Sequence, residues 1–378
     1  MCLTTNLRPN ADFDKNDICL ACRFSHNEIN PITKNDIYLD GLINWLNELK
    51  SRKGRKQFNK YHDCIVGVSG GKDSSRQAHW VRDRLGLNPL LICGAYPPLQ
   101  SSEIGAKNLS NLISKGFDLE VHTPSPKTSA NLVLASFKKY GNVSIPTEMA
   151  LFSIVPRIAI EKKIPLIFWG ENPATQVGDS KVMGENVYDG NNLRNLNTLS
   201  MKGYEWTLNE IDSKKSVFYQ YPQVEQMEKR AVSIIYLGPA WDDWSMFDNS
   251  EYASLSGLEL RPDDANITGD ISGASMLDEE FTNINMMIKF YKFGFGRAND
   301  YVCEMIRSGR ISREEGIEIV EKYDGICHES VINSFCKYID ITIEDFWNIV
   351  NKFVNPLLFD IRESRRPIKK FQVGRNID

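Results

Sequence analysis

The residues best placed to do chemistry form the turn Ser69-Gly70-Gly71-Lys72-Asp73-Ser74, which follows the apolar run 65–68. The run predicts a buried strand, and residues 74–85 predict a helix. Two glycines in such a turn permit positive φ angles and close backbone approach, so several N–H groups can converge on an anion at the start of the helix. The turn therefore predicts a phosphate-binding loop.

The spacing within this turn excludes one common class of phosphate loop. The loop of kinases and GTPases needs a glycine, four further residues and then Gly-Lys-Ser or Gly-Lys-Thr. Here Lys72 is followed by Asp73, and no such spacing surrounds it. Phosphoryl transfer of that kind is therefore disfavoured, and an ordinary strand-to-helix turn is the remaining alternative.

Three of the eight cysteines lie near the N-terminus and could bind a metal. Cys19 and Cys22 form a Cys-x-x-Cys pair, and Cys2 lies upstream of them. A tetrahedral zinc site built from two such pairs would need a cysteine at position 5, where the chain has Thr5. The candidates for a fourth ligand are His26, Cys303 and Cys327. Separate buried thiols and a redox-active pair are the alternatives to zinc.

Apolar runs and helical patterns alternate after the turn, which predicts an α/β fold with a doubly wound parallel sheet. The predicted strands are 65–68, 89–94, 118–122, 165–169 and 234–239, and the predicted helices between them are 74–85, 103–115 and 147–162. Ligands of such sheets bind beyond the carboxyl ends of the strands. Gly170, Glu171 and Asn172 are therefore expected on the same rim as the phosphate-binding loop.

The sequence divides into three predicted regions. Residues 1–55 form a cysteine module with a helix over 36–50, residues 56–240 form the α/β domain, and residues 241–378 are mostly helical. Within the second region, residues 178–222 are rich in Asn, Gly and Ser and suggest an insertion or lid. In the third region, Ser312 with Glu315 and Thr342 with Asp345 are capping patterns that predict helix starts.

The composition indicates which binding partners and which cellular compartment to expect for the protein. The net charge is −4 and the sequence pI is about 5.9, so the basic excess typical of nucleic-acid binding is missing. No apolar stretch reaches the length of a membrane span, and the first residues lack the basic-then-apolar pattern of a signal peptide. We therefore expect a cytoplasmic protein whose cysteines are thiols or metal ligands.

The turn closely resembles the signature of the PP-loop ATP pyrophosphatases, adenylating enzymes that include the asparagine and GMP synthetases. The resemblance implies a PP-loop/HUP-like fold that uses ATP and Mg²⁺. It implies that Ser69, Gly70, Gly71, Lys72, Asp73 and Ser74 form the ATP site, with Asp73 helping to hold Mg²⁺ and with catalytic roles for Lys72 and Asp73. Their place on the same rim adds Gly170 to the predicted ATP site and Glu171 to the predicted catalytic residues; the alternative for Glu171 is a solvated acid in a turn.

The order of motifs along nearly the whole chain is similar to that of the N-acetyl sugar amidotransferases of surface-polysaccharide synthesis, the WbpG- and PseA-like group. The motifs are the cysteine module, 69–74, 169–173, 236–242, 292–300 and 306–310. Thr5 departs from the cysteine that this family often has there.

This resemblance implies an ATP-dependent conversion of an acetamido group into an acetamidino group on a nucleotide-activated N-acetyl sugar, in lipopolysaccharide O-antigen synthesis. It implies that ammonia comes from a glutaminase and cyclase-like protein pair similar to imidazole glycerol phosphate synthase. The candidates for binding the substrate are Asn172, Asp242, Lys292, Arg297 and Arg310, because amide, carboxylate and cationic groups suit an amide or an anionic sugar.

Two other functions remain open at this point. A tRNA-modifying member of the same superfamily, a thiolase or a lysidine synthetase, would share the ATP loop and could use the cysteines to face RNA. A non-catalytic scaffold could bind ATP and recruit a glutaminase. Bound RNA would favour the first, and the absence of pyrophosphate release would favour the second.

Overall fold

The structure of the protein is a computed structural model. It describes residues 1–9, 11–25, 35–51, 59–94, 96–169, 204–241, 245–363 and 365–374. Its centre is a five-stranded sheet in which every strand runs parallel, in the order β3-β2-β1-β4-β5. The strands are β1 (Cys64–Val68), β2 (Pro89–Gly94), β3 (Asp118–His122), β4 (Leu166–Trp169) and β5 (Ser233–Tyr236). The strand order reverses between β1 and β4, which is where open α/β sheets bind their ligands.

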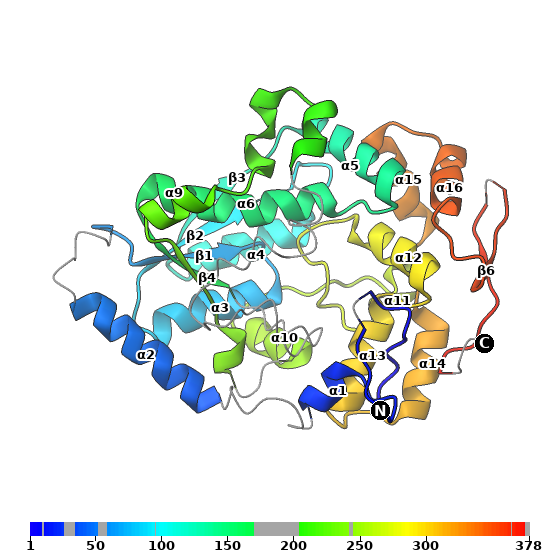
Figure 1. Cartoon of the computed structure of the whole chain (residues 1–378), viewed down its shortest axis with the longest axis horizontal. Helices are drawn as coiled ribbons and strands as arrows, with labels where there is room; N and C mark the ends of the chain where they lie inside the picture. The colour runs from blue at the N-terminus through cyan, green and yellow to red at the C-terminus, as the bar shows by residue number, and fades with distance from the viewer. Residues whose placement is uncertain are drawn as a thin grey trace.

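Helices cover both faces of this sheet, which confirms the doubly wound prediction (Figure 1). One face packs against α6 (Ile145–Lys162) and α9 (Val224–Lys229), and the other packs against α2 (Asn35–Ser51), α3 (Lys72–Asp83) and α4 (Glu103–Ser114). Successive side chains of β1 point to opposite faces of the sheet, so Ile65 packs in the first core and Val66 packs in the second. A strand buried on both faces needs such continuous apolar sequence.

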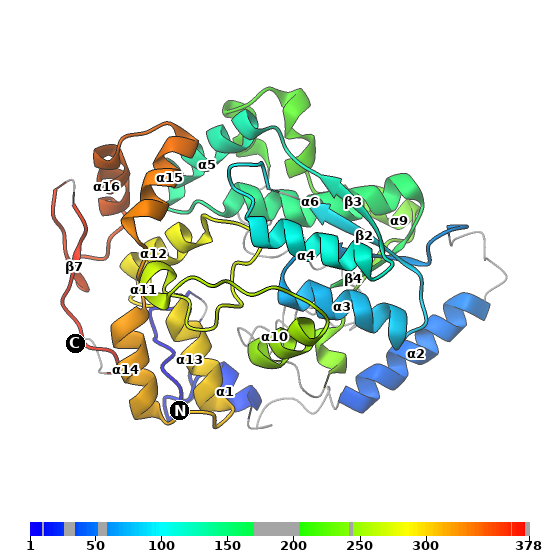
Figure 2. The same cartoon turned by 180° about the vertical axis from the view of Figure 1, so that it is seen from behind.

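The C-terminal region is mostly helical, as predicted, and it lies beside the sheet (Figure 2). Its helices are α10 (Met246–Leu255), α11 (Ala265–Thr268), α12 (Thr282–Phe293), α13 (Arg297–Arg307), α14 (Arg313–Tyr323), α15 (Glu329–Ile339) and α16 (Ile343–Asn351). A short antiparallel pair, β6 (Phe359–Asp360) with β7 (Ile368–Lys369), follows them. Both predicted capping boxes are present, at Ser312 and at Thr342.

One helix that the sequence analysis missed joins the two regions. This helix, α5 (Pro126–Tyr140), packs Val133 and Phe137 into the same core as α12, α15 and α16. The sequence does contain signals for both ends of this helix, because Pro126 lies in its first turn and Gly141 ends it with φ +55°. The C-terminal helices are thereby fixed against the sheet.

The predicted lid is wrong for the part that the structure describes. Two 3-10 helices, η5 (Glu205–Asn209) and η6 (Ser213–Tyr219), follow residue 203. They bury Trp206 and Tyr219 in the core on the α6 face. Residues 178–203 lie outside the described residues.

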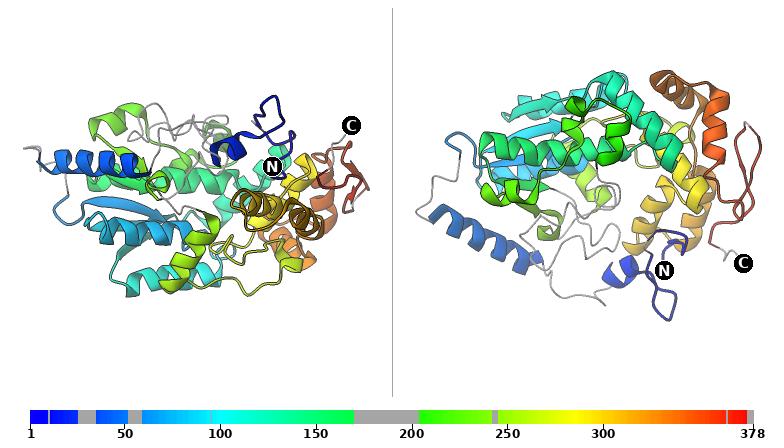
Figure 3. Two further views of the ribbon diagram at one scale, coloured as in Figure 1. Left: turned by 90° about the horizontal axis from the view of Figure 1, so that it is seen from below. Right: turned by 45° about the horizontal axis from the view of Figure 1, so that its top comes forward.

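The N-terminal segment lies against the C-terminal region, at the opposite end of the sequence (Figure 3). Its short helix, α1 (Leu20–Ser25), follows the bridge between Phe13 and Cys19 and lies near α13. Among the described residues, none of the helices has both the length and the apolar character that crossing a bilayer requires.

Candidate functional site

The predicted phosphate loop leaves the carboxyl end of β1 and enters α3 beside the point where the strand order reverses. Gly70 has φ +90°, and a Cβ there would lie 2.7 Å from the carbonyl oxygen of Gly105. Gly71 is different, because its φ of −85° and ψ of 166° suit any residue. Of the two glycines, Gly70 therefore adopts the positive φ that the sequence permits, and Gly71 does not.

Two hydroxyl groups from the start of α3 hold the loop in its conformation. The Ser74 hydroxyl accepts from the N–H of Ser69 at 3.4 Å and donates to the carbonyl of Gly71 at 3.2 Å. The Ser75 hydroxyl donates to the same carbonyl at 2.8 Å. The loop is also tied to α4, because the side-chain amide of Asn108 donates to the Gly70 carbonyl at 3.0 Å. The loop is thus braced from inside and from a neighbouring helix.

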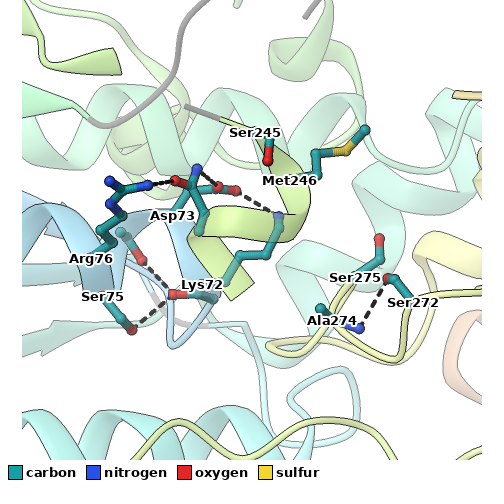
Figure 4. Close-up of polar contacts among 12 residues, drawn as sticks. Lys72, Asp73, Ser75, Arg76, Ser245, Met246, Ser272, Ala274 and Ser275 are labelled. Atoms are coloured by element: carbon teal, nitrogen blue, oxygen red, sulfur yellow. Dashed lines mark hydrogen bonds and ion pairs between the residues drawn. The ribbon is translucent and has the colours of Figure 1, made fainter. Parts of the chain in front are cut away.

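Lys72 and Asp73 begin α3 and face the start of α10 (Figure 4). Lys72 is 7% exposed, and its Nζ donates to Oδ2 of Asp73 at 2.8 Å. The other carboxylate oxygen of Asp73 accepts from Asn249 at 2.6 Å. Burial lowers the pKa of Lys72, but Asp73 and Tyr301 outweigh burial and raise it above its ordinary value. Lys72 is therefore a permanent cation at the helix N-terminus.

Arg76 extends this network one turn further along α3. Its guanidinium donates to Oδ1 of Asn249 at 2.7 Å and stacks on Trp241, with the guanidinium carbon 4.5 Å from the ring centroid. Asn249 thus connects Arg76 to Asp73 through its two amide atoms. The network fixes the orientation of the Asp73 carboxylate.

Two half-buried acids from the C-terminal region approach the loop, and the sequence analysis missed both. Asp278 interacts with Ser69 and accepts from the hydroxyl of Tyr96 at 3.0 Å. Glu304 accepts from the backbone N–H of Met246 at 2.6 Å, and it interacts with Lys72. Burial raises the pKa of both carboxyls. No local motif marks either acid, because only the tertiary packing brings it to the loop.

A cavity of about 120 Å³ lies beside the loop. Its walls include the loop residues Ser69 and Ser74 and two glycines of the strands, Gly67 and Gly94. A Cβ at Gly67 would lie 2.8 Å from the indole nitrogen of Trp169. A side chain at this glycine would therefore collide with the wall of the cavity.

A second cavity, of about 220 Å³, shares the wall residue Leu151 of α6 with the first. It is both polar and aromatic, with walls formed by Gln100, Thr147, Glu148, Glu279, Arg297, Phe335 and Tyr338 among others. Burial raises the pKa of Glu279 to about 8, so this carboxyl is mostly protonated at neutral pH. Such a cavity offers ring faces for stacking and several hydrogen-bonding groups.

The structure separates the three predicted cationic substrate contacts. Arg297 lies at the start of α13 and lines the second cavity, and its buried Nε lacks a hydrogen-bond partner among the described residues. Lys292 instead donates to the carbonyl of Tyr140 at 3.0 Å, at the end of α5. Arg310 pairs with Asp248 at 2.9 Å and is partly exposed. Of the three, Arg297 alone lines either of these two cavities.

Several predicted site residues cannot be placed. Gly170, Glu171, Asn172, Asp242 and His26 lie outside the described residues. Their predicted roles stay predictions.

The N-terminal cysteines do come together. The sulfur atoms of Cys2, Cys19 and Cys22 all lie within 4.8 Å of one another and are buried, so the cluster could bind a metal. The distance between the sulfurs of Cys2 and Cys19 is 3.6 Å. Hydrogen bonds with the neighbouring thiols, that of Cys19 first, lower the pKa of Cys2 against the effect of burial. Hydrogen bonds within the same group of thiols raise the pKa of Cys22 and of Cys303, so among these three the thiolate form that metals bind is favoured at Cys2.

Comparison with known proteins identifies the C-terminal region. Residues 277–373 match the family model described as "LPS biosynthesis protein WbpG-like, C-terminal domain". None of the curated proteins matches the chain significantly. The matched region begins beside Asp278 and contains Arg297 and Glu304, the residues that this region contributes to the site. The similarity to this family thus covers residues 277–373 of the 378, and it agrees with the resemblance drawn from the sequence.

Proposed function

We propose that the protein is an ATP-dependent amidotransferase that converts an acetamido group on an activated bacterial sugar into an acetamidino group. The observation that carries this proposal is the contact between two parts of the chain. Asp278 and Glu304, from the WbpG-like region, approach the glycine loop at the end of β1. A region similar to a family of lipopolysaccharide biosynthesis proteins and the predicted phosphate-binding loop thus contribute to the same part of the molecule.

ATP fits the loop and the smaller cavity. The left-handed Gly70, the start of α3 and the Lys72 ammonium form a cationic seat for the β- and γ-phosphates. The cavity beside Gly67 and Gly94 is suited to the nucleoside. Asp73 is the carboxylate that would hold Mg²⁺, which as a hard cation prefers carboxylate and phosphate oxygens. When bound, this ion would neutralise charge on the departing pyrophosphate.

The reaction must activate an amide, because an amide carbonyl is a poor electrophile and its oxygen a poor leaving group. In this proposal the carbonyl oxygen attacks the α-phosphorus of ATP and pyrophosphate leaves, while the amide nitrogen gives up its proton. Ammonia then adds to the carbon of this adenylated imidate. AMP departs with the former carbonyl oxygen, and the product is an amidinium. Lys72 stabilises the negative charge that develops on the pyrophosphate.

The larger cavity suits the sugar. Phe335 and Tyr338 contribute apolar wall, and Thr147 and Gln100 offer hydrogen bonds to hydroxyl or amide groups. Arg297 is the cation that would meet a diphosphate or a uronate carboxylate. Because Leu151 lines both cavities, a sugar in one would lie across this side chain from a nucleotide in the other. Lys292 and Arg310 are left out of this assignment, since each is engaged elsewhere.

The proposal includes partners and a cofactor. Ammonia would come from a glutaminase and cyclase-like protein pair, as the family resemblance implies, and nucleic acid is not expected. The cysteine cluster would hold a structural zinc ion, because two of its thiols form the Cys-x-x-Cys pair that is common in such sites. The supply of ATP and the eight buried free thiols both suit the cytoplasm.

Mass spectrometry tests the reaction. The protein is incubated with ATP, Mg²⁺, ammonium and a panel of UDP-linked diacetamido sugars. The mass of one sugar should fall by the difference between O and NH. The K72M variant should leave the masses of all sugars in the panel unchanged. A panel that the wild-type protein also leaves unchanged, or conversion by the K72M variant at the wild-type rate, would contradict the proposal.

A further inference from the structure

Helix α13 holds the N-terminal segment through one of its faces. Asn299 donates to the backbone carbonyl of Leu3 at 3.3 Å, and Asp300 forms an ion pair with Arg8. One turn further along, Cys303 is 2% exposed and lies in the same apolar cluster as the three N-terminal cysteines. Residues from the two ends of the chain thus meet at a fourth buried thiol.

The sulfur of Cys303 lies next to the sulfur of Cys2. The hydroxyl of Thr4 contacts both atoms, at 3.2 Å from Cys2 Sγ and 3.8 Å from Cys303 Sγ, and the two thiols interact directly. In a tetrahedral zinc site with bonds of about 2.3 Å, ligand sulfurs are about 3.8 Å apart. The 3.6 Å between Cys2 and Cys19 already matches that spacing. Cys2, Cys19 and Cys22 thus lie within 4.8 Å of one another, and Cys303 lies beside this group at Cys2, from where a small movement would bring its sulfur to a shared metal.

We propose that Cys303 is the fourth ligand of this metal centre, which would hold zinc through Cys2, Cys19, Cys22 and Cys303. The centre would then connect the N-terminal segment to α13. This proposal extends the zinc assignment above and does not depend on the reaction.

The surroundings favour Cys303 over the other cysteine candidate. Four thiolates around Zn²⁺ leave an excess of negative charge, and the Arg307 guanidinium interacts with both Cys2 and Cys303. Cys327 instead packs in the core of α12, α15 and α16, away from the cluster. Helix α13 thus supplies both a ligand and a countercharge to the site.

The position of this centre has a consequence for the substrate cavity. A cavity of about 250 Å³ has walls that include Cys19, Cys303 and Arg297. Arg297, at the first turn of α13, also lines the cavity assigned to the sugar. By fixing α13 to the N-terminal segment, the metal would fix the position of Arg297.

X-ray absorption at the zinc edge tests the proposal on the wild-type protein, purified under reducing conditions from zinc-supplemented medium. Elemental analysis should find one zinc ion per chain, and the absorption fine structure should show four sulfur atoms at about 2.3 Å. Three sulfurs with one nitrogen or oxygen would overturn the assignment of Cys303. A protein that neither contains nor takes up zinc would overturn the centre itself.

Paired variants give a second readout. C303S should lower zinc affinity in chelator competition by more than about 100-fold, because losing even an outer-shell partner costs about 10- to 100-fold. C327S, a change of the same type at another buried thiol, should keep wild-type affinity. Equal affinity of C303S and the wild type would overturn the proposal. If C303S does not fold, the sulfur count from the wild-type protein decides.

Discussion

The two glycines of the phosphate loop should respond differently to the same substitution, G70A or G71A. At Gly70, alanine must adopt φ +90°, and its Cβ would lie 2.7 Å from the carbonyl oxygen of Gly105. At Gly71 the backbone suits alanine, and the nearest atom to its Cβ would be the Ser69 hydroxyl at 3.3 Å. The backbone carbonyl at Gly105 cannot rotate away, whereas the Ser69 hydroxyl can.

The cost at Gly70 follows from these values. A left-handed conformation costs alanine about 1–2 kcal/mol, and forcing extra volume into a packed site costs about 1–3 kcal/mol. Lower entropy of the unfolded chain offsets about 0.4–1 kcal/mol. The net loss for G70A is therefore about 3 kcal/mol, and for G71A it is within about 0.5 kcal/mol.

Thermal unfolding, followed by circular dichroism, measures the difference. For 378 residues, an unfolding entropy of about 2.1 cal/mol/K per residue amounts to about 0.8 kcal/mol/K, so G70A should lower Tm by about 4 °C. G71A should leave Tm within about 1 °C of the wild type. Equal Tm values for G70A and the wild type, or a larger loss in G71A than in G70A, would refute the reasoning about this loop.

Three further predictions concern single side chains. K72M should slow AMP formation by about 10²- to 10³-fold in a coupled pyrophosphate assay, because it removes a cation aimed at developing charge; a loss below tenfold would contradict that role. R297M should raise KM for the sugar and leave the ATP affinity measured by calorimetry unchanged. The control R310M, at a partly exposed ion pair, should change neither value. Equal effects of the two variants would contradict the assignment of Arg297. The carboxyl of Glu279 has its pKa raised from 4.5 to about 8, so its contribution to stability is full below pH 4.5 and is lost as pH rises through 8. In urea unfolding between pH 5 and 9, E279Q should therefore lose less stability than the wild type, and parallel pH curves would contradict the prediction.

Local sequence was sufficient to predict most of the sheet and its loop. Strands β2 and β3 have the predicted bounds: β2 is a short apolar run between turn residues, and β3 alternates Leu119 and Val121 with polar residues. Helix α3 begins at Lys72, two residues before the prediction, since the N-terminal residues of a helix carry weak periodicity. Helix α5 was missed although Pro126 and Gly141 mark its ends.

The composition of the site was less predictable than its loop. Asn249, Asp278 and Glu304 belong to segments far from the loop in sequence, and nothing in their local sequence indicates burial next to Lys72. Lys292 looked equivalent to Arg297 by charge and proximity in the sequence. Tertiary packing separates them, since Lys292 caps α5 while Arg297 lines the cavity.

The cysteine cluster was predictable in part, more than the distant site residues and less than the loop. The Cys-x-x-Cys pair made Cys19 and Cys22 candidates from spacing alone, and their burial beside Cys2 agrees with that interpretation. Spacing could not choose among the distant candidates, because the separation of Cys303 from the pair carries no periodic signal. Only the docking of α13 on the N-terminal segment distinguishes Cys303 from Cys327.

Oxygen transfer tests the central claim most directly. An acetamido sugar labelled with ¹⁸O at its carbonyl is incubated with the protein, ATP, Mg²⁺ and ammonium, and the nucleotide product is analysed by mass spectrometry. If the carbonyl is adenylated at this site, the label should appear in the phosphate of AMP, with pyrophosphate as the other product. Label in orthophosphate together with ADP, or label in water with unlabelled AMP, would contradict the account.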